Sequence, residues 1–130
     1  MGPLIEGRWQ GYALQQRLDL PAPELYVILK SERPMRVSQA WHAGQPRAFA
    51  TLSRDPGNCT WSEIPTTPGC LMREHLAVAL LPEDITKAQI QDFSVSFSSP
   101  RGVREVMVPA AYTRGFLAGM ERLQASPNTR

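Results

Sequence analysis

The stretch FSVSFSSPRGVREVMV, residues 93–108, predicts a β-hairpin and decides the fold class of the chain. Phenylalanine and valine alternate with serine through residues 93–98, which is the period of a strand with one apolar face and one hydroxyl face. Proline and glycine at 99–102 turn the chain, and the return strand carries Val106 and Val108 on one face. We therefore expect an antiparallel pair of strands with one face toward a core.

An amphipathic helix is expected directly after this hairpin. Pro109 opens the element, and apolar residues then recur at helical spacing with charged residues on the opposite face. The apolar positions are Phe116, Leu117, Met120 and Leu123. We expect a helix over 110–124 that packs on the sheet through these side chains, with Gly115 and Gly119 allowing it to lie close.

The rest of the chain is a series of short apolar runs separated by turns rich in glycine and proline. Strands are expected as an edge-like strand over 9–18, a strand buried on both faces or nearly so over 25–29, a half-buried strand over 35–41 and a further strand over 48–52. Residues 70–81 are ambiguous between strand and helix, and Pro82 begins a short helix that ends by Asp92. The predicted fold class is mainly β, β-sandwich-like and mostly antiparallel, with one short helix and the C-terminal amphipathic helix packed on the sheet.

The length of 130 residues fits a single domain. The globular part is expected to span 9–125, and the tail 126–130 is expected to be flexible. Residues 1–8 end in Ile5-Glu-Gly-Arg8, which matches the cleavage site for factor Xa. These first residues are therefore either native sequence or a remnant of an expression vector joined to a chain whose leader was removed.

Charge and hydropathy argue against two classes of partner. The net charge of +2 is too small for a nucleic-acid-binding surface, so no nucleic acid is expected as a partner. Twelve of the 14 basic residues are arginine, and they are scattered over every segment without forming a block. The longest uninterrupted apolar run, residues 76–81, is far shorter than the roughly 20 residues of a membrane helix. The chain is therefore not expected to span a membrane.

The two cysteines, Cys59 and Cys70, flank a proline-rich segment that can bring their sulfurs together. A disulfide is the favoured interpretation, and it would imply an oxidising compartment. Two free thiols, or part of a zinc site, are the alternatives. Zinc is disfavoured because the sequence has neither a Cys-x-x-Cys nor a His-x-x-x-His pair.

Catalytic motifs are missing from the sequence. There is no nucleophile elbow, phosphate loop, dinucleotide fingerprint or zinc-protease motif. A Cys70 nucleophile with a base such as His42 or His75 would need an orienting acid, and Asp84 or Asp92 could be nominated only by assertion. We expect no catalytic, cofactor-binding or metal-binding residue, and the protein is predicted not to be an enzyme.

Two tryptophans are candidate contacts for a partner. Trp61 lies among polar residues in the long loop predicted over 54–69, and Trp41 lies at a strand end. Long loops in compact domains are often functional, and exposed aromatic residues are typical anchors of interfaces. The alternative for Trp61 is that it folds back on the sheet and fills one end of the sandwich.

The C-terminal half of the chain resembles the invasion-associated locus B family. The resemblance rests on Cys59, on Gly69-Cys70, on the strand 93–97, and on the strand and Gly-Phe helix of 106–123. Here the gap between the two cysteines is longer than in that family, and the first half of the chain shows only a generic opening at Trp9. The resemblance implies a bacterial envelope or secreted protein with a β-sandwich-like body, linked to host-cell invasion and without a cofactor or defined catalytic residues.

Two classes of function follow. The first is a non-enzymatic bacterial envelope protein, periplasmic or secreted, which acts through contacts with another protein. It is favoured by the expected disulfide and by the missing catalytic site. The second is a cytoplasmic accessory or binding module, which two free thiols would support.

Overall fold

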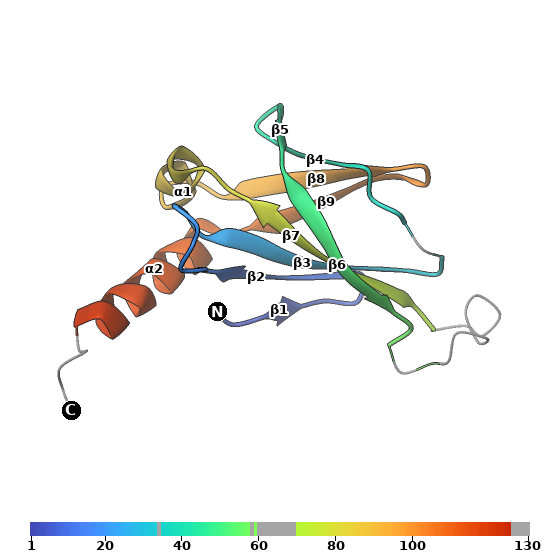
Figure 1. Ribbon diagram of the computed structural model, residues 1–130, viewed down its shortest axis with the longest axis horizontal. Coiled ribbons are helices and arrows are strands. Elements are labelled where there is room, and N and C mark those ends of the chain that lie inside the picture. Colours follow the sequence, from blue (N-terminus) through green and yellow to red (C-terminus); the bar gives the residue numbers. More distant parts are fainter. Residues whose placement is uncertain (34, 58, 60–69, 126–130) are drawn as a thin grey trace.

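The computed structural model describes residues 1–33, 35–57, 59 and 70–125 of the chain. Within these residues two antiparallel sheets form the body, and helices lie at one end of it (Figure 1). The large sheet has the order β1-β2-β3-β7-β6, with β1 (Ile5–Glu6), β2 (Gln10–Gln15), β3 (Glu24–Ser31), β7 (Met72–Ala79) and β6 (Phe49–Asp55). The small sheet has the order β5-β4-β8-β9, with β5 (Gln45–Arg47), β4 (Gln39–His42), β8 (Phe93–Ser99) and β9 (Gly102–Val108). This architecture confirms the predicted mainly β, sandwich-like class.

The hairpin that decided the fold class is confirmed. Strands β8 and β9 pair from Phe93 opposite Val108 to Ser99 opposite Gly102. The two phenylalanines and the one valine of β8 are buried, whereas its serines are half-buried. The side chain of Phe97 is fully buried between the sheets, as the alternation predicted.

Strand β3 runs through the centre of the large sheet, between β2 and β7. On one face of β3 Leu25, Val27 and Leu29 are fully buried in the core, and on the other face Ile28 is buried and Tyr26 half-buried. The run is therefore buried on nearly both faces, as predicted. The ambiguous segment 70–81 forms β7, which pairs with β3 along its whole length. A strand is favoured there because alternate residues face the core and because β3 offers a full set of backbone partners.

Two expectations about the strands were wrong. The segment 9–18 is not at an edge, because β1 pairs with β2 and itself forms the edge of the large sheet. In the segment 35–41 the strand begins only at Gln39. Upstream of it Arg36 has a φ of 58°, in the left-handed region, which breaks the strand alternation. The exposure pattern shifts accordingly, so that Gln39 is exposed and Ala40 is buried.

The two predicted helices are α1 (Pro82–Ala88) and α2 (Ala110–Ala125). Helix α2 covers the core with Phe116, which is buried, while Leu117 and Met120 pack against the core and remain half-buried. The prediction for Leu123 was wrong because the second half of α2 extends beyond the sheets (Figure 1), and its side chain is 77% exposed. Space beside Gly115 is empty, so its missing side chain does not serve a close approach to the sheet.

Candidate binding surface

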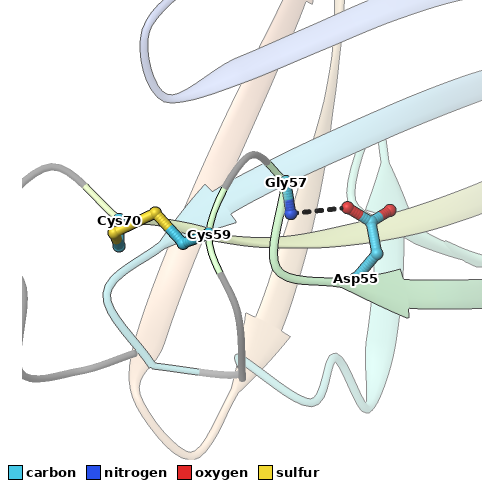
Figure 2. Close-up of a disulfide and its surroundings, with 4 residues drawn as sticks. All are labelled: Asp55, Gly57, Cys59 and Cys70. Atoms are coloured by element: carbon cyan, nitrogen blue, oxygen red, sulfur yellow. Dashed lines mark hydrogen bonds between the residues drawn. A yellow bond between two sulfur atoms is a disulfide. The ribbon is translucent and has the colours of Figure 1, made fainter. Parts of the chain in front are cut away.

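The cysteines predicted to pair form a disulfide. Cys59 and Cys70 are bonded, with their Cα atoms 5.8 Å apart (Figure 2). The bond joins the chain just after the turn that follows β6 to the residues that lead into β7. Because β6 and β7 are neighbours in the large sheet, the bond closes the loop between them at its base.

Breaking this disulfide is expected to lower the free energy of unfolding by about 2–3 kcal/mol, because the bond restricts the unfolded chain. Urea unfolding of the variant Cys59→Ser/Cys70→Ser measures the loss. Wild-type protein unfolded with a reductant should give the same midpoint as the variant. A midpoint that the reductant leaves unchanged would contradict the expectation.

The turn after β6 is held by one carboxylate. The Oδ1 atom of Asp55 accepts hydrogen bonds from the backbone N–H of Gly57 at 2.8 Å (Figure 2) and from Nε of Arg73 at 2.8 Å. Its Oδ2 atom lies 2.6 Å from Nε2 of His75. Burial raises the pKa of Asp55, but these three hydrogen bonds outweigh it and the pKa lies below its ordinary 3.8. The loop base is therefore fixed to β7 by an ionised side chain.

Both histidines make hydrogen bonds to other secondary-structure elements. Nδ1 of His75 lies 2.5 Å from the hydroxyl of Tyr26, so both of its ring nitrogens are engaged in a chain that links β3, β7 and β6. Nδ1 of His42 bonds the carbonyl of Ser94 at 2.9 Å, and its Nε2 lies 3.6 Å from Oδ1 of Asp84. These contacts tie secondary-structure elements together. In the part of the chain that the structure describes, no group of three or more metal-ligating side chains occurs.

The acids nominated as partners of a base also have structural roles. Asp84 accepts the backbone N–H of Leu81 at 2.8 Å at the start of α1, and it pairs with Arg47. The Oδ1 atom of Asp92 accepts the backbone N–H of Ala110 at 2.8 Å and so caps the start of α2. Neither acid contacts a cysteine thiol, because both cysteines are in the disulfide.

Basic side chains gather at the end of the sandwich opposite the helices. Three cavities of about 410, 530 and 240 Å³ lie there. The first shares Met35 and Arg101 with the second, and Lys30 with the third. Seven of the chain's 14 basic residues line them, against the two acids Glu6 and Glu32. We call this surface the cationic end; its basic residues are Arg8, Lys30, Arg33, Arg36, Arg73, Arg101 and Arg104.

The cationic end is assembled from four parts of the fold. Figure 1 places the β1–β2 turn, the connection after β3, the β8–β9 turn and the base of the disulfide loop together at this end. Cys59 itself lines the smallest of the three cavities. The arginines are scattered along the sequence, but the topology brings several of the segments that carry them together.

The basic side chains at this end differ in whether an acidic side chain neutralises them. Lys30 pairs with Glu6 at 2.7 Å, and Arg73 pairs with Asp55. In contrast, the guanidinium groups of Arg33, Arg36 and Arg101 have no hydrogen-bond acceptor and no ion-pair partner among the described residues. Positive charge is therefore available for a ligand at the rim of the cavities.

Of the two tryptophans predicted as contacts, the described residues include only Trp41. Trp41 lies on β4 opposite Ser96 of β8 and is half-buried, on the hydroxyl face of the small sheet. Its role as a partner contact stays a prediction. Trp61 lies outside the described residues, as does most of the loop predicted over 54–69. The structure adds Trp9, which lines the cavity of about 410 Å³. The guanidinium carbon of Arg8 lies 5.2 Å from the centre of the Trp9 ring.

Comparison with known proteins leaves the family open. The chain matches no protein-family model, and it has no significant match among curated proteins or solved structures. The resemblance to the invasion-associated locus B family therefore stays a prediction. Among the described residues, no helix is long and apolar enough to cross a membrane.

Proposed function

We propose that this protein is a non-enzymatic envelope or secreted protein that binds another protein through its cationic end. The observation that carries the proposal is the gathering of seven basic side chains around three adjoining cavities. A surface with this charge is complementary to an acidic patch, and such complementarity speeds association and selects partners. The partner is accordingly a protein with an acidic surface.

The composition of the surface supports a protein partner. Arginine and tryptophan are the residues most enriched at the energetic centres of protein interfaces, and the cationic end holds both types, with Trp9 43% exposed. A long basic stripe that could follow a nucleic-acid backbone is not supported by a net charge of +2. The disulfide at the base of the neighbouring loop adds rigidity, which lowers the entropy lost on binding.

The disulfide also supports the location outside the cytoplasm, where such bonds persist. The resemblance to the invasion-associated locus B family points the same way and suggests a role at the bacterial surface during contact with a host cell. The alternative, a cytoplasmic accessory module, would be favoured if both cysteines of the native protein were found as free thiols.

Charge reversal at the rim tests the proposal. The variant Arg33→Glu/Arg101→Glu should bind the partner at least about tenfold more weakly, because two favourable ion contacts become repulsive. The partner is captured by cross-linking in envelope fractions, identified, and titrated against the purified variants. Wild-type binding should weaken as salt rises, and the variant should be much less sensitive to salt.

The matched control is Lys87→Glu/Arg114→Glu, which makes the same change in net charge on the two helices, away from the cationic end. It should bind as the wild type does. Equal weakening in both variants would show that only net charge matters and would contradict a defined surface. Trp61→Ala and Trp41→Ala in the same assay test the two tryptophans, and a loss of binding without a change in thermal midpoint would assign them to the interface.

A further inference from the structure

Arg104 is half-buried and lines the 410 Å³ cavity. On β9, Arg104 lies on the same face as Val106 and Val108, which are both fully buried. Its NH1 nitrogen donates to the carbonyl of Lys30 at 3.1 Å, and its NH2 nitrogen donates to the carbonyl of Trp9 at 2.5 Å. The group is thus fixed by backbone acceptors of the large sheet.

These acceptors orient the cation without neutralising it. Among the described residues no carboxylate lies within ion-pair distance of Arg104, and its third contact is the sulfur of Met35, 3.5 Å away. Three of its five N–H groups are used by these contacts, which leaves two for another acceptor. Burial lowers the pKa of Arg104 from its ordinary value, which reflects the cost of holding a charge away from water. An anion bound in the cavity would offset that cost.

Two further guanidinium groups surround the opening of the same cavity. Arg33 comes from the connection after β3 in the large sheet, and Arg101 comes from the β8–β9 turn of the small sheet. The carbonyl of Arg33 accepts a hydrogen bond from the hydroxyl of Ser31, which orders this connection. The acid that lines the cavity is Glu32. Lys30 is paired with Glu6, so the charges of three arginines face this one carboxylate.

We propose that this cavity binds a small organic oxyanion, a phosphate ester or a carboxylate attached to an apolar group. Arg104, Arg33 and Arg101 would bind the charged oxygens, because guanidinium groups match the geometry of phosphate and carboxylate. Trp9 and Met35 line the same cavity and would contact the apolar part. A volume of about 410 Å³ is within the usual range for ligand pockets. The ligand site shares Arg33 and Arg101 with the proposed protein-binding surface, whereas Arg104 is assigned to the small ligand alone.

Calorimetric titration with phenyl phosphate in a buffer low in chloride tests the site. Binding to the wild type is expected to be saturable, and the N–H signal of the Trp9 indole should shift in NMR spectra. Arg104→Gln should weaken binding at least about tenfold, since it removes charge-assisted hydrogen bonds. Arg33→Gln/Arg101→Gln, at exposed positions where folding is not at risk, should weaken it to a similar degree. Arg114→Gln on α2 is the matched control and should leave it unchanged.

Two other probes complete the test. Inorganic phosphate should bind more weakly than phenyl phosphate, and phenol should not bind. Equal affinity for the wild type and for both arginine variants, or an unmoved Trp9 signal, would overturn the proposal. Another outcome is that phenyl phosphate fails to bind while an acidic peptide competes with the protein partner at the same arginines. In that case the cavity receives a carboxylate of the partner protein. This result overturns the small-ligand site and leaves the proposed function standing.

Discussion

Replacing Arg47 by methionine is expected to lower the free energy of unfolding by about 3–5 kcal/mol, because it leaves a buried carboxylate without its counter-ion. Nε and NH2 of Arg47 donate to the two carboxylate oxygens of Asp84 at 2.8 and 2.7 Å. Only 10% of the Arg47 side chain and 7% of the Asp84 side chain are exposed, so solvent screens this pair very little. The pair joins β5 to the start of α1 and holds the small sheet to the helical end of the molecule.

Two variants separate charge from packing in this prediction. Arg47→Lys keeps the charge but loses the two-point contact, and it should be destabilised less than Arg47→Met. Arg47→Met/Asp84→Asn removes both charges, while the asparagine oxygen can still accept the N–H of Leu81. This double variant should regain more than half of the lost stability, as measured by urea unfolding. If it is no more stable than Arg47→Met, an unpaired charge is not the cause of the loss.

The dependence of stability on pH gives an independent measurement. Burial raises the pKa of Asp84, but the hydrogen bonds from Arg47 and Leu81 outweigh it, so the folded pKa lies below the ordinary 3.8. The wild type should therefore lose stability as the pH falls below about 4. In Arg47→Met the unpaired carboxyl should have a raised folded pKa, so acidification neutralises it and relieves the cost. The gap in stability between the two proteins should narrow from pH 7 to pH 4.

The fold could be predicted where one segment carries its own signal. The alternation of residues 93–98, with proline and glycine immediately after it, is local and needs no information about the rest of the chain. Helix α2 and the disulfide were predicted for the same reason, since each depends on a spacing within a short stretch. The exposure of Leu123 could not be predicted, because it depends on where the sheets end beneath the helix.

The cationic end could not be predicted from the sequence. Its basic residues come from turns and strands far apart along the chain, between Arg8 and Arg104, and only the order of the strands brings these segments together. The same holds for the pair between Arg47 and Asp84, whose members are 37 positions apart. A count of scattered arginines therefore gave no sign of the surface that they form.

A contact between residues far apart in the sequence also explains why the strand predicted over 35–41 begins late. The same contact is expected to have a large effect on stability. Glu74 on β7 points into the core and is only 1% exposed. Its Oε1 atom accepts the backbone N–H of Arg36 at 3.0 Å, and its Oε2 atom accepts that of Val37 at 3.1 Å. These backbone groups are held by a side chain 37 or more positions away, and Arg36 adopts the left-handed conformation, so no strand forms there.

Glu74→Ala is expected to cost about 2–5 kcal/mol, because two backbone N–H groups near the core lose their acceptor together. Glu74→Gln keeps the shape and one acceptor oxygen, and it should cost less. Arg54→Ala tests the partly exposed ion pair, whose Nε lies 3.4 Å from Oε1, and a change within about 1 kcal/mol is expected there. Hydrogen exchange locates the effect: the amides of Arg36 and Val37 should exchange much faster in Glu74→Ala, whereas those of β8 should follow the global loss of stability. The exchange of these two amides depends directly on the hydrogen bonds that the substitution removes. If their protection is unchanged, contacts other than those of Glu74 hold the connection between the sheets.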